Sequence, residues 1–448
     1  MLKEEIEEAI KYLFSINRNL MGLEVRNTLK YVQNKILPDS KIKSISSGSK
    51  IYDWQVPCEW NIEEAYVKNK YGKKIIDIKN NNLHLMAYSE PVDKKVSKEE
   101  LLEHLHTLPE HPKWIPYRTS FYKKNWAFCC EHELLNTKDF TGPFEVKIKS
   151  SFNDEGVLNW LECYKKGTLD DEILISSYCC HPNLANDNLS GFVAAAFLFR
   201  YLQSIKTKYS YRLVILPETI GAIAFLSQAN VSNIVGGMIL SCVAGPDKPS
   251  IKEGFNKEHW INRAAHQALN EITDGDYITY PFTPNGSDER QYSTPGFRIV
   301  TPSIHKSKYH EYLEYHTSAD NLNFISIKDI NYSIDIHKKW IENIESFCYP
   351  ERLDKYCEFQ LGRRNLYPST GGSLNHFGHD IKKRLLKRSF DFNKNMNINN
   401  EHLEAFNWLM HLADGKNSNF DIAEKSNLSL TVINEAISIF YQNDLVKI

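Results

Sequence analysis

A histidine and a carboxylate lie close together in the stretch SSYCCHPNLANDNLSG, residues 176–191. His181 follows an apolar run, and Asp187 stands just before a segment of helical composition. Imidazole and carboxylate together are the ligands that suit Zn²⁺ with an open catalytic position. The stretch therefore indicates a metal site, provided that other parts of the chain bring further ligands to it.

Other polar residues also follow apolar runs. They are Glu218 after LVILP and Cys242 after MILS. Later polar stretches contribute Asp288 and Glu289 in NGSDERQY, and His316 and Asp320 in LEYHTSADN. In an open parallel sheet, ligands bind beyond the carboxyl ends of the strands, so these residues are expected to converge on one rim. A carboxylate that does not bind the metal would then act as general base, and Glu218 has the right position for that role.

Each of these residues also has a structural interpretation. His181 before a proline could close a strand end, Asp187 could cap the next helix, and His316 could be a surface residue in a polar turn. Cys180 beside His181 would give a thiol mechanism as the runner-up. Neighbours in a strand point to opposite faces, however, so adjacency does not make a catalytic pair.

A second histidine cluster occurs in LLEHLHTLPEHP, which contains His104, His106 and His111. No carboxylate accompanies these histidines in a pattern suited to a metal. We therefore expect a solvated surface at this segment rather than a second metal site.

The elements that must position these residues show a repeating pattern from about residue 138 to 350. Apolar runs of strand length alternate with helical segments: DEILISSY, GFVAAAFLFRYLQSI, YRLVILPE, IGAIAFLSQA, VGGMILSCVAG and WINRAAHQALNEI. This alternation predicts an α/β fold, a mostly parallel mixed sheet with helices on both faces.

The rest of the chain differs in composition and sequence pattern, which predicts several domains. Residues 1–41 and 131–350 would form the catalytic domain, and residues 42–130, with short β-prone runs such as KIIDI, an inserted β-rich module. Residues 351–385 are predicted to be a connector. Residues 386–448 hold helical segments and a β-prone end in the order of a winged helix-turn-helix.

The composition is that of a globular protein. The chain has 448 residues, a net charge of −2, 42% hydrophobic and 25% charged residues, which favours neither nucleic acid nor a membrane surface as partner. The acidic, amphipathic start is unlike a secretion signal. Nine cysteines without zinc-finger spacing predict reduced thiols and a cytoplasmic protein.

Six stretches carry a family likeness: IPYRTSFYKKNWAFC, SSYCCHPNLANDNLSG, PETIGAIAFL, GSDERQY, EYHTSADNL and LGRRNLYPSTGG. With them the chain resembles the bacterial aminopeptidase-like domain proteins, often found beside polysaccharide biosynthesis functions, within the superfamily of zinc aminopeptidases and glutaminyl cyclases. The likeness extends over nearly the whole chain. It implies a zinc aminopeptidase-like fold with an inserted β module and a C-terminal winged helix.

The resemblance also implies roles for individual residues. His181 and His316 would bind metal, Asp187 would be the aspartate that bridges two metals in dinuclear relatives, and Glu218 would be the general base. Thr219 stands where relatives have a glutamate ligand. Ser241 and Cys242 stand where they have a metal-binding acid.

These departures favour a single zinc held by His181, Asp187 and His316, with two zinc ions as the alternative. Cys242, Thr219 and Asp320 are further candidates for metal binding or support of the ligands. The acids of relatives that hold a substrate's α-amino group would correspond to Asp288 and Glu289, while Arg290 could hold a carboxylate or phosphate-like group.

The favoured function is zinc-dependent hydrolysis of an amide or peptide bond in a small substrate by a homo-oligomeric enzyme. One alternative is a zinc-binding scaffold without activity, suggested by Thr219. Another is a DNA-binding regulator with a sensor domain. Against the regulator, the predicted recognition segment contains Glu435 and Asp444 and no basic residue before Lys447.

Overall fold

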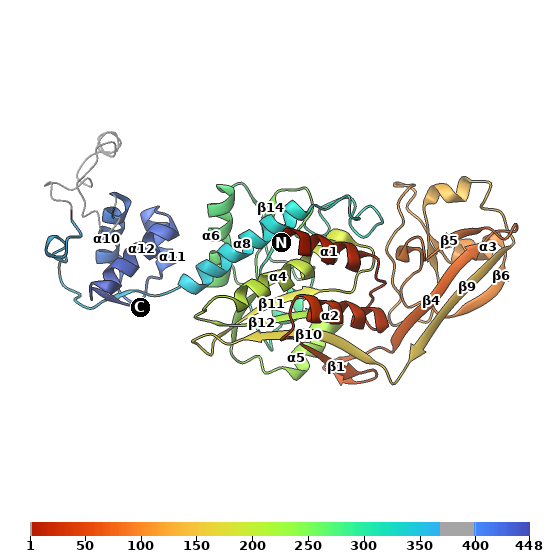
Figure 1. Ribbon diagram of the computed structural model, residues 1–448, viewed down its shortest axis with the longest axis horizontal. Coiled ribbons are helices and arrows are strands. Elements are labelled where there is room, and N and C mark those ends of the chain that lie inside the picture. The colour runs from red at the N-terminus through yellow and green to blue at the C-terminus, as the bar shows by residue number, and fades with distance from the viewer. Residues whose placement is uncertain (1, 368–397, 399) are drawn as a thin grey trace. The chain divides into compact units, whose positions relative to one another are not determined.

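A computed structural model describes residues 2–367, 398 and 400–448 of the chain (Figure 1). The chain separates into two units, Met1–Ile341 and Glu342–Ile448, and each is described by itself.

The centre of the first unit is an eight-stranded mixed sheet in the order β1-β10-β12-β11-β13-β16-β14-β15. The strands are β1 (Lys41–Ser46), β10 (Val157–Lys165), β11 (Glu172–Tyr178), β12 (Ser210–Leu216), β13 (Ile234–Leu240), β14 (Pro249–Lys252), β15 (Ile278–Tyr280) and β16 (Ser303–Lys306). The neighbours β12, β11, β13 and β16 are parallel, whereas β1, β10 and β14 pair antiparallel. The predicted α/β fold with a mixed sheet is confirmed.

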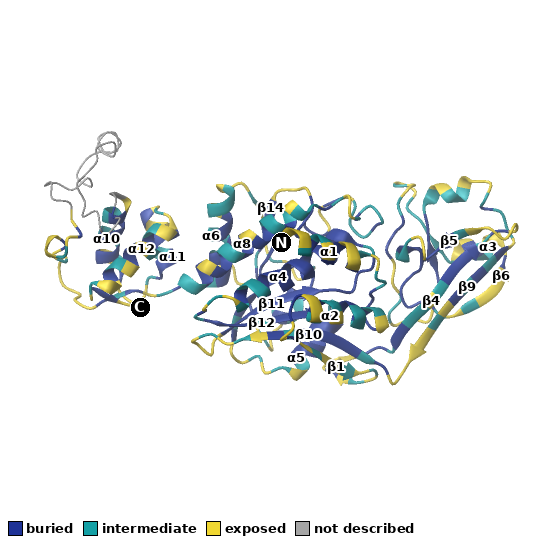
Figure 2. Ribbon diagram, viewed as in Figure 1, coloured by how far each residue is buried: buried dark blue, intermediate teal, exposed yellow. Residues whose placement is uncertain are grey.

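Strand β11 lies in the middle of the parallel part because its sequence, EILISSY, suits complete burial. Every one of its residues is buried, and β12 and β13 are almost as deep (Figure 2). Uninterrupted apolar runs are typical of strands that are covered on both faces. In β13, Gly237 is needed because a Cβ there would lie 2.5 Å from the backbone oxygen of Leu174 in β11.

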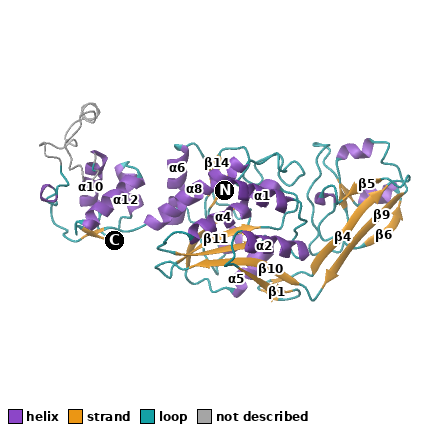
Figure 3. Cartoon of the chain, viewed as in Figure 1, coloured by secondary structure: helices purple, strands orange, loops and turns teal. Residues whose placement is uncertain are grey.

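Helices cover both faces of this sheet, with α4 and α5 on opposite sides (Figure 3). The helices of the first unit are α1 (Leu2–Phe14), α2 (Leu23–Lys35), α3 (Lys98–Glu103), α4 (Gly191–Gln203), α5 (Ile220–Gln228), α6 (Trp260–Thr273), α7 (Glu289–Tyr292) and the long α8 (Ile327–Ser346), whose last residues belong to the second unit. Helix α4, with the sequence GFVAAAFLFRYLQ, is buried over most of its length against β11. Its small alanines allow this close packing.

A second, four-stranded antiparallel sheet has the order β5-β4-β9-β6. Its strands are β4 (Glu59–Lys68), β5 (Lys74–Asp77), β6 (Val92–Val96) and β9 (Phe144–Asn153). Two short pairs lie nearby in sequence, β2 (Lys50–Ile51) with β3 (Trp54–Gln55) and β7 (Leu105–His106) with β8 (Phe128–Cys129). Strand β9 of this sheet lies beyond residue 130, and β1 joins the large sheet instead. The boundaries of the predicted inserted module, residues 42 and 130, stay a prediction.

In the second unit, three helices are followed by a short strand. Helices α10 (Asn400–Leu412), α11 (Asn419–Ser426) and α12 (Leu430–Gln442) precede β18 (Val446–Lys447), which pairs with β17 (Glu351–Arg352). Ser418 begins α11 with a capping box closed by Asp421. The winged-helix assignment stays a prediction, and much of the predicted connector 351–385 and the start of 386–448 lie outside the described residues.

No helix in the described part of the chain is long and apolar enough to cross a membrane.

Arg212 in β12 joins three neighbouring strands of the large sheet. Its guanidinium donates to Glu172 of β11 at 2.5 and 2.9 Å and to Glu162 of β10 at 2.7 Å. The side chains of Arg212 and its partners are largely buried. Removing the cation would therefore leave two carboxylates close together with little solvent to screen them.

We expect Arg212→Met to lower the free energy of unfolding by about 3 kcal/mol, measured by urea denaturation. The matched control is Lys166→Ala, which removes an exposed ion pair with Asp170 and should cost at most about 1 kcal/mol. Equal losses in the two variants would contradict this role of Arg212.

Candidate metal centre and active site

The candidate site lies at the carboxyl ends of the parallel strands. β11 ends at Tyr178 and is followed by His181, and β12 ends at Leu216 and is followed by Glu218. Because β11 and β12 pair in parallel up to Tyr178 and Leu216, the residues after them emerge at the same edge. This is the position where open α/β sheets bind their ligands.

Three of the residues singled out in the sequence form a compact group. The ligand atoms of His181, Asp187 and His316 lie within 4.8 Å of one another, and no other such group occurs among the residues that the structure describes. His316 Nε2 is 2.9 Å from Asp187 Oδ2, and the two imidazole rings are 5.4 Å apart. His181 and Asp187 are buried, while His316 is partly exposed.

Asp187 is held from both sides of its carboxylate. The hydroxyl of Tyr178 donates to Oδ1 at 2.6 Å, which leaves Oδ2 facing His316. Its backbone N–H donates to Asp320 Oδ2 at 3.0 Å, and Oδ1 of Asp320 accepts the N–H groups of Ala185 and Asn186 at 3.2 and 2.6 Å. Asp320 thus fixes the turn that carries Asp187. It supports the candidate ligand Asp187 and does not belong to the ligand group itself.

Three residues at this edge have backbone conformations that side chains other than glycine rarely adopt. The φ angles are 65° for Thr219, 53° for Cys242 and 55° for His316. Each such conformation costs about 1–3 kcal/mol and persists where the surroundings enforce it. Residues with similar φ angles also occur away from the site, for example Asp274 and Asn427, so these conformations do not by themselves identify a functional site.

Burial and charge set the protonation of His181 and Asp187. Burial lowers the pKa of His181 to about 4, so its imidazole is neutral at physiological pH. Burial alone would raise the pKa of Asp187, but the nearby His181 and His316 rings and the Tyr178 hydroxyl together lower it. A neutral imidazole and an ionised carboxylate are the forms that bind metal.

Glu218 stands beside this group without being part of it. Its Oε2 is 3.8 Å from His181 Nε2, and its Oε1 accepts a hydrogen bond from Ser287 at 2.8 Å. Burial and the charge of Asp187 raise the pKa of Glu218 to about 7, against the Ser287 hydrogen bond. A carboxylate poised near neutral pH can both accept and return a proton.

The other predicted site residues surround Glu218. The backbone N–H of Thr219 donates to Asp288 at 2.7 Å, and Arg290 donates to the Thr219 hydroxyl at 3.0 Å. Burial, with the Glu218 charge next, raises the pKa of Asp288 well above its usual range. Asp288 therefore supports the Glu218–Thr219 turn from inside the protein.

Glu289 lies deeper and is engaged elsewhere. It pairs with Lys252 at 2.5 Å and accepts the Tyr309 hydroxyl at 2.9 Å, and both ends of the ion pair are buried. No described contact supports the predicted role of Asp288 and Glu289 in substrate recognition, which stays a prediction. Arg290 does reach the cavity described below.

The two cysteines at the site are thiols. Cys242 Sγ lies 3.8 Å from Asp187 Oδ1, and Cys180 Sγ lies 3.6 Å from His181 Nδ1. Burial, followed by neighbouring carboxylate charges, raises the pKa of both well above the ordinary value. Since the thiolate is the nucleophile, this environment argues against the thiol mechanism.

A cavity of about 390 Å³ opens onto the site. Its polar lining includes His181, Glu218, Thr219, Arg290 and His316, and Trp54 and Tyr122 are among its aromatic lining. A small substrate could therefore reach Glu218 and both histidines from one side.

Sequence reasoning missed three residues that shape the site: Tyr178, Ser287 and Tyr117. The Tyr117 ring lies 5.2 Å from that of His181 and 5.1 Å from that of His316, and its N–H donates to the His316 carbonyl at 2.9 Å. Tyr178 directly precedes the Cys-Cys-His turn, and Ser287 lies within GSDERQY, so proximity to recognised motifs could have indicated both. Tyr117 lies within another recognised stretch, IPYRTSFYKKNWAFC, but its distance from His181 and His316 in the sequence concealed its contact with them.

The donor set suits a metal ion. Asp187 Oδ2 and His316 Nε2 are buried atoms without a well-aligned hydrogen bond, although they lie close together. Buried polar atoms without partners are costly, and a shared cation would satisfy both. Two imidazoles and one carboxylate are a ligand combination found at catalytic zinc sites.

Comparisons with known proteins agree with this geometry. A family profile described as a domain of unknown function, DUF4910, matches residues 7–346. A Clostridium acetobutylicum protein, described as a candidate polysaccharide biosynthesis protein with an aminopeptidase-like domain, is 37% identical over 446 residues, covering 99% of this chain and 96% of the relative. The resemblance to aminopeptidase-like domain proteins is thereby confirmed.

Solved structures show the same relationship. The crystal structure of a candidate peptidase from Clostridium acetobutylicum has a TM-score of 0.86 and 36% identity, covering 100% of this chain and 96% of that one. A zinc aminopeptidase from Bacillus subtilis has a TM-score of 0.54 at 10% identity, covering 76% of this chain and 94% of that one. The second likeness shows an aminopeptidase-like fold.

Zinc content tests the ligand group. After gel filtration of protein produced with added zinc, we expect His181→Ala and His316→Ala each to weaken zinc binding by more than about 100-fold, because loss of a direct ligand exceeds the cost of outer-shell changes. His111→Ala is the matched control, since that ring stacks on Trp114 outside the group. Unchanged zinc in both site variants would exclude this ligand set.

Proposed function

The chain belongs to the DUF4910 family, and we propose that it is a zinc-dependent hydrolase of an amide or peptide bond. The observation that carries the proposal is the group of His181, Asp187 and His316 with Glu218 only 3.8 Å from His181. Ligands of this kind beside a separate carboxylate support metal-assisted hydrolysis.

His181, Asp187 and His316 would hold the zinc ion. When bound, zinc supplies a Lewis acid that lowers the pKa of water and polarises a carbonyl oxygen. The residues of the chain prepare this chemistry: burial keeps His181 neutral, and Tyr178 and Asp320 fix the carboxylate and the turn of Asp187.

Glu218 would move the proton. Its carboxylate would accept a proton from the attacking water as the C–O bond forms. It would then return this proton to the nitrogen, so that the C–N bond breaks and the amine leaves. The Ser287 hydroxyl orients Oε1 and leaves Oε2 on the side of His181. The same residue therefore serves as base and acid in one turnover.

The contacts of Asp187 favour one zinc ion over two. A carboxylate that bridges two metals needs both oxygens, but here the Tyr178 hydroxyl donates to Oδ1 at 2.6 Å. Thr219, in place of a glutamate ligand, accepts a hydrogen bond from Arg290, and Cys242 is a protonated thiol. Each group that would hold a second ion is thus engaged or unsuitable.

Arg290 supports a substrate with a negatively charged group. It lines the cavity with Glu218 and His316, and its Nε is buried without a hydrogen-bond partner among the described residues. A carboxylate or phosphate-like group would satisfy this donor. Amide bonds in small peptides and in modified sugars both fit, and the name of the relative favours the second.

A zinc-binding scaffold without activity is the second candidate. It rests on Thr219, whose hydroxyl cannot replace a glutamate as an anionic ligand. The winged-helix regulator receives less support, because a helix that reads DNA needs basic residues for the phosphates. Helix α12 carries the acidic Glu435 instead, which pairs with His402 at 2.9 Å.

Catalysis by Glu218 can be tested with aminoacyl anilides and N-acyl amino sugars. We expect Glu218→Gln to lower kcat by about 10²–10⁴-fold with unchanged zinc content, because the amide cannot accept the proton. Glu258→Gln, at an exposed position of the same unit, is the matched control. Bound zinc without hydrolysis of any amide would favour the scaffold.

A further inference from the structure

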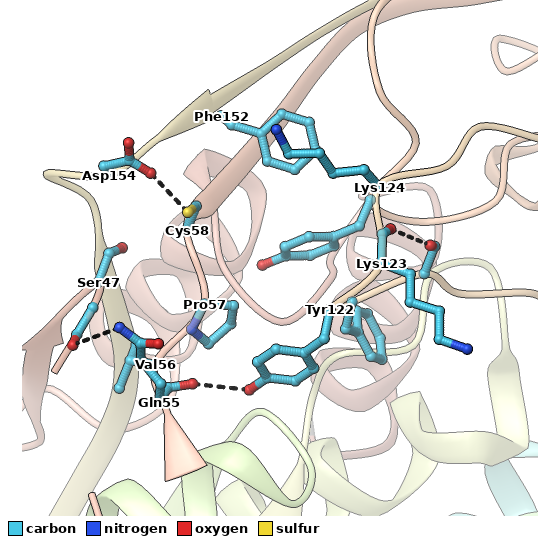
Figure 4. A pocket seen from close by; sticks show the side chains of 14 residues that line it. Ser47, Gln55, Val56, Pro57, Cys58, Tyr122, Lys123, Lys124, Phe152 and Asp154 are labelled. Atoms are coloured by element: carbon cyan, nitrogen blue, oxygen red, sulfur yellow. Dashed lines mark hydrogen bonds between the residues drawn. The ribbon is translucent and has the colours of Figure 1, made fainter. Parts of the chain in front are cut away.

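A second cavity, drawn in Figure 4, has a volume of about 430 Å³ and shares Phe121 and Tyr122 with the cavity of the candidate active site. The segment that carries Tyr122, Lys123 and Lys124 forms one side, and the strand ends at Gln55 and Phe152 form others. Neither Glu218 nor any of the three candidate metal ligands lines it, so its chemistry is separate from that of Glu218.

The two cavities share a wall. Phe121 and Tyr122 line both, while Trp54 belongs to the first cavity and its neighbour Gln55 to the second. The Tyr122 hydroxyl donates to the Gln55 carbonyl at 3.0 Å, and the Tyr122 and Trp54 rings are 6.0 Å apart (Figure 4). A substrate made of two linked groups could therefore place one group in each cavity, with the link beside Phe121 and Tyr122.

Aromatic rings give the second cavity apolar faces. The Tyr88 ring lies 5.3 Å from that of Phe121 and 6.2 Å from that of Phe152, and it stacks on Trp60 behind it. Tyr88 is held at a φ of 66°, which is unusual for a bulky residue. The fold thus keeps a strained backbone conformation at a residue that lines this cavity.

Two hydroxyl groups of the lining residues have no hydrogen-bond partner among the described residues. They are Tyr88 Oη and Ser47 Oγ, and both atoms are buried. Tyr88 as a whole is only 2% exposed. A hydroxyl both donates and accepts, so a buried one without a partner is costly unless a ligand or water satisfies it.

The combination of aromatic faces and unpartnered hydroxyls is complementary to a sugar ring. The C–H face of a pyranose packs on aromatic rings, and its hydroxyl groups exchange hydrogen bonds with hydroxyls at the edge. An aromatic side chain of a peptide would fill the same volume but would leave Ser47 Oγ and Tyr88 Oη unsatisfied. The polar atoms therefore favour the sugar.

We propose that this second cavity binds a pyranose ring of the substrate. The proposal deepens the proposed function and rests on it for the chemistry: the bond cleaved at Glu218 would be an amide that links an acyl or aminoacyl group to an amino sugar. Binding of the sugar itself needs neither zinc nor Glu218, because neither lines the second cavity.

The test is a titration of the full-length protein with N-acetylglucosamine, in which binding is measured by NMR. We expect binding to be retained in Glu218→Gln and after zinc removal with EDTA. In the Ser47→Ala/Tyr88→Phe double variant it should weaken by about 10–100-fold, because two hydrogen bonds to the ring are lost. Both substitutions remove only an oxygen, which preserves the packing.

The matched control replaces exposed hydroxyl residues of the same types, Ser232→Ala and Tyr71→Phe, and should bind like the unmodified protein. Absence of binding by N-acetylglucosamine, or equal binding by the double variant, would overturn the proposal. So would binding of phenylalanine amide in this cavity with no loss in the double variant. Failure of hydrolysis with binding intact would count against the proposed function alone.

Discussion

The buried carboxylate of Asp187 is the group on which the arrangement of the candidate site depends. Tyr178 at the end of β11 takes one of its oxygens, His316 faces the other, and Asp320 holds its backbone N–H. An ionised carboxylate in an apolar interior is stable only when each lone pair meets a donor or a cation. The turn after β11 therefore holds the negative charge of Asp187 next to His181, where it would attract a cation.

The resemblance to zinc aminopeptidases implies that two of the usual acidic ligands are replaced in this chain, one of them by Thr219. Where relatives would have a second acidic ligand, Thr219 is hydrogen-bonded to Arg290. This arrangement exchanges a negative charge for a positive one at the mouth of the cavity. In the proposed function, this exchange of charge would favour substrates with an acidic group near the amide over substrates with a cationic amino group.

Much of this could be predicted from the sequence because the relevant signals are local. Uninterrupted apolar runs identified the central strands, and polar residues directly after them, such as His181 and Glu218, were recognisable at strand ends. Asp288 was less predictable: the polar stretch that contains it gave no sign that its side chain is buried and accepts the backbone N–H of Thr219. Tyr117 reaches His181 and His316 only through long-range packing, which no spacing in the sequence encodes.

The most direct test of the account is a crystal structure of the zinc-loaded protein with anomalous scattering recorded at the zinc absorption edge. The account predicts one anomalous peak, about 2.0–2.2 Å from the ligand atoms of His181, Asp187 and His316, with the Tyr178 hydroxyl still on the other oxygen of Asp187. Two peaks bridged by Asp187, or zinc bound elsewhere in the chain, would contradict it.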